Sequence, residues 1–300
     1  MMTRRMDFLL GPLALLLTIS HTSIGQSTRA RDANRLPGHL VEVTAAEFFL
    51  RAPDTIPSGL TTFQLIQAGL VADRVRDGVT GQAAVADKGD NTRGMHMLWV
   101  VRLDSGKSIA DLHRAEEAGE TPRWVRHMGG PGFMRPPGST NATMLLEPGN
   151  YALVCYVGSA RANRARYHLL HGMFRALTVI PARSNSAALP TPDVVVRVTA
   201  GNVLSFSKPL RAGRLVIHVQ NETDSHIEFK AVRVPDGMSG KQFMAQSGDV
   251  EGASSPGGLS NVPPQSWVMT TLDFIAGEHI IGTRPSLRHP SSQIVTVGPR

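Results

Sequence analysis

Residues 39–65 read HLVEVTAAEFFLRAPDTIPSGLTTFQL, and a related segment returns later in the chain. Residues 194–219 read VVVRVTAGNVLSFSKPLRAGRLVIHV, which matches the first segment at VEVTA against VRVTA and at PSG against RAG with a single gap. Within the first segment Phe63 and Leu65 fall on one face, because apolar and polar residues alternate. A period of two is typical of half-buried β-strands. The repeat therefore predicts β-structure that is built twice.

Two further pairs of segments recur in the same order. HMLWVVRLDSG at 96–106 pairs with HIEFKAVRVPDG at 226–237, and LLEPGNYALVC at 145–155 pairs loosely with LDFIAGEHIIGT at 272–283. Between the copies, residues 182–192 read ARSNSAALPTP, a small and polar stretch with two prolines that suits a linker. The pattern indicates a tandem duplication.

We expect one domain over 38–181 and a second over 193–298. Each copy consists of short runs rich in Val, Ile, Phe, Leu and Thr, divided by clusters of Pro, Gly, Asn and Asp. Regular spacing of turns is typical of an antiparallel β-sandwich. The fold class predicted is all-β, two antiparallel sandwiches in tandem. One short helical insert is expected in the first, over 108–119, where Ser108 and Asp111 resemble a capping box.

Residues 1–25 have the layout of a secretory signal. A basic lead, MMTRRM, precedes a 12-residue apolar run and then the small residues Ser23 and Gly25. Such a run is too short to span a membrane, and no later segment reaches 18 apolar residues. We expect cleavage near Gly25 and a periplasmic or secreted protein with no transmembrane segment after signal removal.

The composition limits the partners. The formal net charge is +7, of which the signal supplies only +1 through Arg4, Arg5 and Asp7. A basic exported protein favours acidic protein partners or an anionic envelope surface. Lysine and arginine are scattered and aromatic residues make up only 5% of the chain, which argues against nucleic-acid binding. The oligomeric state is left open.

Cys155 is the only cysteine, so the chain has no internal disulfide. A leftover thiol in an oxidising compartment needs to be buried or ligated. Tyr151, Leu153 and Cys155 share one face of a strand, so that the cysteine taken alone reads as a buried apolar residue. Its surroundings in the sequence add a second interpretation.

GNYALVC followed by HLLHGM resembles the ligand segment of the cupredoxins, the blue copper proteins. That family carries G-x-Y-x-x-x-C at a strand end and then H-x-x-x-G-M on a loop, and the matching residues are Gly149, Tyr151, Cys155, His168, Gly172 and Met173. A further histidine ligand lies upstream in the family, and His96 has that place here. The resemblance implies Greek-key sandwiches and one type 1 copper. The ligands it implies are His96, Cys155, His168 and Met173.

The residue types agree with that chemistry. Two imidazoles, a thiolate and a weak thioether suit a copper ion that alternates between Cu(I) and Cu(II). Zinc also accepts two histidines and one cysteine, so the residues alone do not select the metal. His171 competes with His168 for the metal, but it stands only two residues before Met173.

The sequence departs from the family in two places. Twelve residues separate Cys155 from His168, and they carry three arginines: Arg161, Arg164 and Arg166. These either form a basic rim that steers an acidic partner or belong to a solvated loop. A polar insertion over 71–94, just before His96, is expected to form a flap of unassigned role.

The second copy lacks the pattern. Thr283 takes the place of Cys155, while Ser286 and Ser291 take the places of His168 and Met173. A threonine hydroxyl cannot replace a thiolate for copper, so we expect the second domain to serve a structural or docking role.

The function predicted is that of an exported copper-binding cupredoxin, a single-electron carrier. Two alternatives stay open: a copper-holding or copper-delivery protein, and a metal-free cupredoxin-fold binding module. An enzyme is not expected, because Cys155 is flanked by Val154 and Tyr156 rather than by histidines, and paired H-x-H segments are absent. Hydrolase motifs are absent as well. Asn141 and Asn221 open formal glycosylation sequons.

Overall fold

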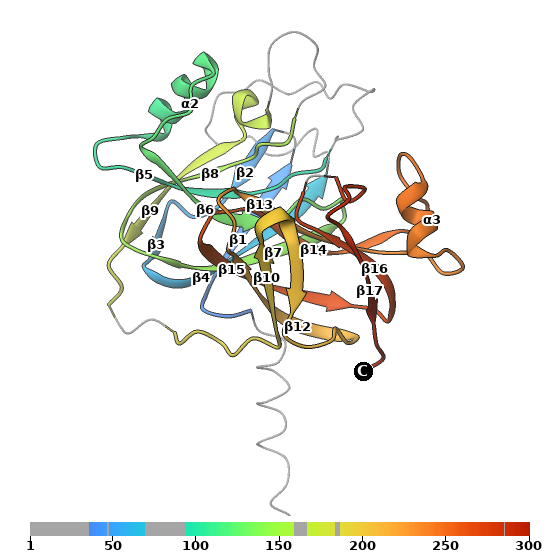
Figure 1. The fold of residues 1–300 in the computed structure, drawn as a ribbon. Helices are drawn as coiled ribbons and strands as arrows, with labels where there is room; N and C mark the ends of the chain where they lie inside the picture. Colours follow the sequence, from blue (N-terminus) through green and yellow to red (C-terminus); the bar gives the residue numbers. More distant parts are fainter. Residues whose placement is uncertain (1–35, 47, 70–93, 159–166, 184–186, 285) are drawn as a thin grey trace, which may run out of the picture. The chain divides into compact units, whose positions relative to one another are not determined.

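The computed structural model describes residues 36–46, 48–69, 94–158, 167–183, 187–284 and 286–300 (Figure 1). The expected signal at 1–25, the three loop arginines and all but the last residue of the 71–94 insertion lie outside the described residues. Within the described ranges, no helix is long and apolar enough to cross a membrane.

Most of the elements are strands, and they form two sheets (Figure 1). The first sheet contains β1 (His39–Ala46), β2 (Phe49–Arg51), β4 (Gly59–Gly69), β7 (Gly138–Leu146), β10 (Val194–Thr199), β11 (Val203–Phe206), β12 (Gly213–Asn221) and β15 (Ser266–Phe274). The second contains β3 (Thr55–Pro57), β5 (Trp99–Leu103), β6 (Val125–Pro131), β8 (Gly149–Val154), β9 (Phe174–Ile180), β13 (Ile227–Arg233), β14 (Ser254–Val262), β16 (Gly277–Gly282) and β17 (Gln293–Val297). The prediction of an all-β fold is confirmed.

The order of strands in each sheet reflects the repeat. The first sheet runs β11-β10-β12-β15-β7-β4-β1-β2, and the second runs β17-β16-β13-β14-β6-β5-β8-β9-β3. Strands from the two sequence repeats thus meet at β15–β7 and at β14–β6, where Met269 pairs with Thr143 and Ser260 pairs with Gly130. Both sheets continue from one repeat into the other. The limits of two separate domains stay a prediction.

The sheets are mixed rather than purely antiparallel. β1 pairs with β4 in parallel, β10 pairs with β12 in parallel, and β3 pairs with β9 in parallel. The expectation of antiparallel sandwiches missed these pairs. Alternation of apolar and polar residues fixes which face of a strand is buried, but it carries no information on the direction of the neighbouring strand.

A common apolar core takes side chains from both sheets. Phe63 and Leu65 of β4 are fully buried in it, as the alternation predicted. Tyr151, Leu153 and Cys155 enter the same core from β8 and the residue after it. The alternating residues Ala152 and Val154 instead join a second cluster under helix α2 (Ile109–Ala118). Strand β8 is therefore buried on both faces.

The predicted helical insert is present as α2. Ser108 is its N-cap, and Ser108 and Asp111 form the reciprocal capping box that the sequence indicated. Gly119 ends the helix in the left-handed conformation, with φ of 72°. A second short helix, α3 (Gly240–Ala245), was not predicted. Two 3-10 turns, η1 (His168–His171) and η2 (Ala200–Asn202), complete the described elements.

The asparagines of both glycosylation sequons, Asn141 and Asn221, form side-chain hydrogen bonds within the fold. The side-chain amide of Asn141 donates to the carbonyl of Thr271 at 2.7 Å, and its oxygen accepts from the Thr271 amide at 2.8 Å. Asn221 is almost fully buried and its amide donates to backbone carbonyls, including that of Val262 at 3.0 Å. Neither side-chain nitrogen is presented to a modifying enzyme in the folded chain.

Candidate metal centre

The paired strands β5 and β8 bring the first two predicted ligands to one end of the second sheet. Trp99, the first residue of β5, pairs with Val154, the last residue of β8. Cys155 follows β8 directly, and His96 precedes β5 by three residues. Because the strands are antiparallel, the residue that follows one lies beside the residues that precede the other. His96 is itself held by a bridge to Met134.

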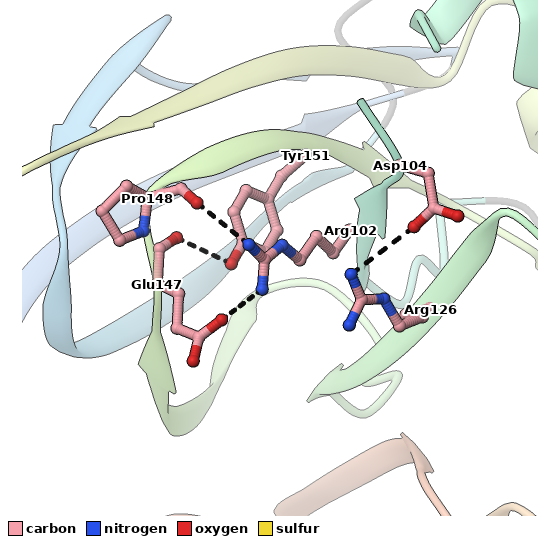
Figure 2. A network of polar contacts seen from close by, with 6 residues as sticks. All are labelled: Arg102, Asp104, Arg126, Glu147, Pro148 and Tyr151. Atoms are coloured by element: carbon pink, nitrogen blue, oxygen red, sulfur yellow. Dashed lines mark hydrogen bonds and ion pairs between the residues drawn. The ribbon is translucent and has the colours of Figure 1, made fainter. Parts of the chain in front are cut away.

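At the other end of β8 a polar network ties the same two strands together (Figure 2). The Tyr151 hydroxyl donates to the carbonyl of Glu147 at 2.9 Å, a tyrosine corner of the kind found in Greek-key sandwiches. From β5, Arg102 pairs with the Glu147 carboxylate and donates to the carbonyl of Pro148 at 3.1 Å. The guanidinium carbon lies 6.0 Å from the centre of the Tyr151 ring. The G-x-Y motif thus anchors the strand that leads to Cys155.

Backbone hydrogen bonds join the end of the loop after β8 to Cys155. The Cys155 amide donates to the Met173 carbonyl at 3.1 Å, and the Leu169 amide donates to the Cys155 carbonyl at 2.9 Å. His168 is the first residue of η1, which ends at Gly172 with φ of 102°, a left-handed conformation that favours glycine. The H-x-x-x-G-M spacing therefore forms one tight turn that starts at His168 and ends beside Cys155.

The structure brings together three of the four predicted ligand residues by their side-chain atoms. The ligand atoms of His96, Cys155 and His168 all lie within 4.8 Å of one another, and the three residues are fully buried. His96 Nδ1 lies 3.3 Å from His168 Nδ1, and Cys155 Sγ lies 3.8 Å from the same His168 nitrogen. The fourth residue, Met173, is fully buried next to them through its backbone bond to Cys155.

These separations fit a bound transition metal. Ligand atoms that lie about 2.0–2.3 Å from a common ion are at most about 4.6 Å apart. The separations of 3.3 and 3.8 Å fall below that limit. The donor set, imidazole and sulfur, suits copper or zinc. His171, the competing histidine of the same turn, is not part of the cluster.

Burial keeps the imidazole of His96 in its metal-binding form. Desolvation, with a smaller contribution from the neighbouring His168, lowers the pKa of His96 to about 3. The neutral ring retains a nitrogen lone pair for a metal, whereas an imidazolium does not. The imidazole of His96 is thus available to a metal ion over the neutral pH range.

Two residues that the sequence analysis missed support the cluster. The Phe48 ring packs against His168 with centroids 4.9 Å apart, and against His171 at 4.6 Å. The Gln67 side chain donates to the His96 carbonyl at 2.7 Å. Gln67 continues the buried face that Phe63 and Leu65 form, so a polar residue at an apolar position was the available signal. Nothing in the sequence singles out Phe48.

The second repeat has no equivalent cluster among the described residues. Thr283 is buried directly after β16, at the place of Cys155, and its hydroxyl donates to the Asn202 side chain at 3.2 Å. Ser286, expected at the place of His168, is exposed. His279 is buried, but its Nδ1 lies against the Gly277 carbonyl at 3.2 Å.

Comparison with known proteins gives matches among solved structures. A scan against protein-family models finds no match, and a search of curated proteins finds none. Among solved structures, a reduced auracyanin from Roseiflexus castenholzii is 17% identical, with 49% of this chain and 100% of that chain covered and a TM-score of 0.28. A blue copper oxidase from Nitrosomonas europaea is 11% identical, with coverage of 87% and 86% and a TM-score of 0.21. A copper nitrite reductase from the same organism is 14% identical, with coverage of 87% and 93% and a TM-score of 0.20.

Two sheets pack around one apolar core, as the resemblance to the cupredoxins implied. The expectation that the chain is not an enzyme is contradicted, because copper nitrite reductases and multicopper oxidases, which are enzymes, are among the structures it resembles. That expectation rested on the missing histidines beside Cys155, on the missing paired H-x-H segments and on the missing hydrolase motifs. Missing motifs exclude particular kinds of site and do not exclude enzymatic activity of another kind.

Proposed function

We propose that the chain is an exported copper protein with one type 1 centre that transfers single electrons. The proposed ligands are His96, Cys155, His168 and Met173. The observation that carries the proposal is the convergence of two imidazoles and the only thiol of the chain within 4.8 Å, in a fully buried position. Bound copper would supply one-electron chemistry by alternating between Cu(I) and Cu(II).

The protein's own groups prepare the site in three ways. The Cys155 thiol gives up its proton on metal binding, and the histidines bind as neutral rings. Burial excludes water from the cluster. The paired strands β5 and β8 and the turn η1 hold the side chains from separate elements. A site held in this way changes little between two oxidation states, which favours rapid electron exchange.

The proposal includes export and an acidic partner. The signal-like segment before Gly25 supports periplasmic or secreted localisation. The net charge of +7 supports association with an acidic redox-partner protein through complementary potentials. Association of this kind weakens as salt rises, so a salt-dependent exchange rate would support it.

The experiment is a titration of the mature protein with Cu(II), followed by visible absorption and EPR spectroscopy. We expect an intense blue band and a narrow copper hyperfine pattern at one copper per chain. Cys155→Ser abolishes both signals. The matched pair His168→Gln and His171→Gln separates the two neighbouring histidines, since only the first removes a member of the cluster.

A colourless protein that takes up zinc at the same residues would contradict the copper assignment. Loss of the blue band in His171→Gln but not in His168→Gln would contradict the ligand set. Because copper enzymes are among the similar structures, the copper-loaded protein should also be assayed for nitrite reduction and for oxygen consumption with a one-electron donor.

A further inference from the structure

A row of aromatic rings crosses the second sheet on the face that carries helix α2. Tyr156 stacks on Trp99 with centroids 4.2 Å apart and planes at 31°. Trp99 meets His127 edge to face at 5.4 Å, and His127 meets His226 edge to face at 4.8 Å. Each ring is in contact with the next, and the row runs across neighbouring strands rather than along one.

The row begins at the proposed metal ligand and ends in the other repeat. Tyr156 follows Cys155 directly in the chain. Trp99 is the first residue of β5. His127 lies on β6, the strand of the first repeat that borders the second repeat in this sheet. His226, just before β13, is exposed. The rings therefore join the buried end of β8 to an exposed position on the second repeat.

Polar contacts fix the rings of the row. Asn261 Nδ2 and His127 Nδ1 lie 2.6 Å apart, which sets the orientation of the imidazole from β14. The hydroxyl of Tyr156 donates to the carboxylate of Glu116 on α2. The indole nitrogen of Trp99 is buried and has no hydrogen-bond partner among the described residues. The hydrogen bonds of His127 and Tyr156 fix the orientation of these two rings.

We propose that Tyr156, Trp99 and His127 form the path by which single electrons pass between Cys155 and a one-electron acceptor at the exposed ring of His226. This inference rests on the proposed function, since it supplies the path for the electron exchanged there. One electron leaves the reduced centre and one arrives at the acceptor, and no bond forms or breaks. The rings mediate the transfer through their π orbitals and are unchanged at the end.

Burial of the ligands favours such a path. His168 is fully buried, so its ring does not itself reach solvent. The only covalent neighbours of the thiolate residue are Val154 and Tyr156, and only the second carries a π system. The second repeat, which lacks a ligand cluster among the described residues, contributes the exposed end of the path at His226.

The first test measures electron transfer along the row. A photo-oxidisable ruthenium polypyridyl complex is attached at His226, with the exposed His39 and His289 replaced by glutamine. After a flash, the rise of the blue band reports oxidation of the copper-loaded centre. We expect Trp99→Leu to slow this step at least about tenfold, equivalent to about 1.4 kcal/mol of barrier. Trp99→Phe, which keeps a ring, should recover much of the rate.

Trp124→Leu is the matched control. Trp124 packs on the same apolar cluster under α2 but does not belong to the row. Its replacement should change the rate by less than about twofold, which is a barrier change of about 0.4 kcal/mol. Equal rates in the Trp99→Leu and Trp124→Leu proteins, with unfolding midpoints like that of the parent, would overturn the path.

The second test needs no copper and so separates the path from the proposed function. In the metal-free protein the photo-oxidised ruthenium takes one electron from the row, and Tyr156 passes its phenolic proton to Glu116 as it is oxidised. We expect an EPR signal of a tyrosyl radical that Tyr156→Phe removes and Trp99→Leu strongly diminishes. A tyrosyl signal of full yield in Trp99→Leu, or no radical in the parent protein, would overturn the inference whether or not copper binds.

Discussion

Gln67 and His96 are joined by a buried hydrogen bond in which the side-chain amide of Gln67 donates to the backbone carbonyl of His96 at 2.7 Å. His96 lies outside the named strands and forms an isolated bridge with Met134. Through this bond, β4 of the first sheet helps to fix the position of His96, a proposed ligand that lies three residues before β5 of the second sheet.

Replacing Gln67 with leucine should destabilise the protein and disturb the metal centre. The His96 carbonyl would lose its buried donor, which costs about 1–3 kcal/mol. Chemical unfolding measures this loss, and the copper hyperfine pattern reports any displacement of His96. Gln64→Leu, on the opposite face of the same strand, is the control and should stay within about 0.5 kcal/mol of the parent. Equal stability of the two variants would contradict the role given to Gln67.

Tyr151→Phe should lower the stability without removing the metal site. The variant loses the hydroxyl bond to the Glu147 carbonyl, worth about 0.5–1.5 kcal/mol, and keeps the buried ring. The unfolding midpoint should fall while the blue band persists. Tyr167→Phe, at a ring that is 36% exposed, serves as control. A lost blue band in Tyr151→Phe would mean that the corner contributes directly to the centre.

Asn141→Ala should weaken the contact between the two repeats. The side chain satisfies both the amide and the carbonyl of Thr271 across the β7–β15 junction, and its loss leaves two buried groups unpaired, each costing about 1–3 kcal/mol. Asn150→Ala, at an exposed position, should be close to neutral. A host that glycosylates exported proteins should add no glycan at Asn141, which mass spectrometry of the product would check.

Stability should fall in mild acid partly because of His127. Burial, with a smaller effect of His226, lowers the pKa of His127 from 6.5 to about 4. Between pH 6.5 and 4, His127 is therefore protonated in the unfolded chain but not in the folded chain. The stability that the neutral His127 contributes is present above pH 6.5 and is lost as the pH falls towards 4. The slope is at most about 1.4 kcal/mol per pH unit.

Comparison of the parent with His127→Gln isolates that titration. Glutamine can bond to Asn261 but carries no proton in this range, so the stability difference between the two proteins should shrink as the pH falls. Both are unfolded in denaturant without metal at several pH values. A constant difference from neutral pH down to about 4 would contradict a depressed pKa.

The local features of this chain were readable from its sequence, and the relations between strands were not. The capping box of α2 and the shared face of Tyr151, Leu153 and Cys155 follow from spacing alone, because helix caps and strand faces depend on near neighbours. The resemblance to the cupredoxins placed His168 and Met173 on a loop after Cys155, and the structure shows that this loop contains the turn η1.

Other features depend on partners distant in the sequence. The parallel pairing of β1 with β4 leaves no mark on the alternation of residues, since the pattern is the same for either direction. Phe48 contacts His168 across 120 residues of chain, and no spacing rule connects them. Gln67 was detectable as a polar residue on an apolar face, but its bond to His96 required the structure.

Both sheets continue from the first repeat into the second. This continuity gives the second repeat a structural role that does not depend on metal ligands. A chain that ended after β9 would leave β6 and β7 as open sheet edges, with backbone donors and acceptors facing solvent. Such edges are templates for pairing with other molecules and for aggregation. By pairing with these edges, β14 and β15 protect the half that carries His96, Cys155 and His168, which is a reason for the second copy to be retained.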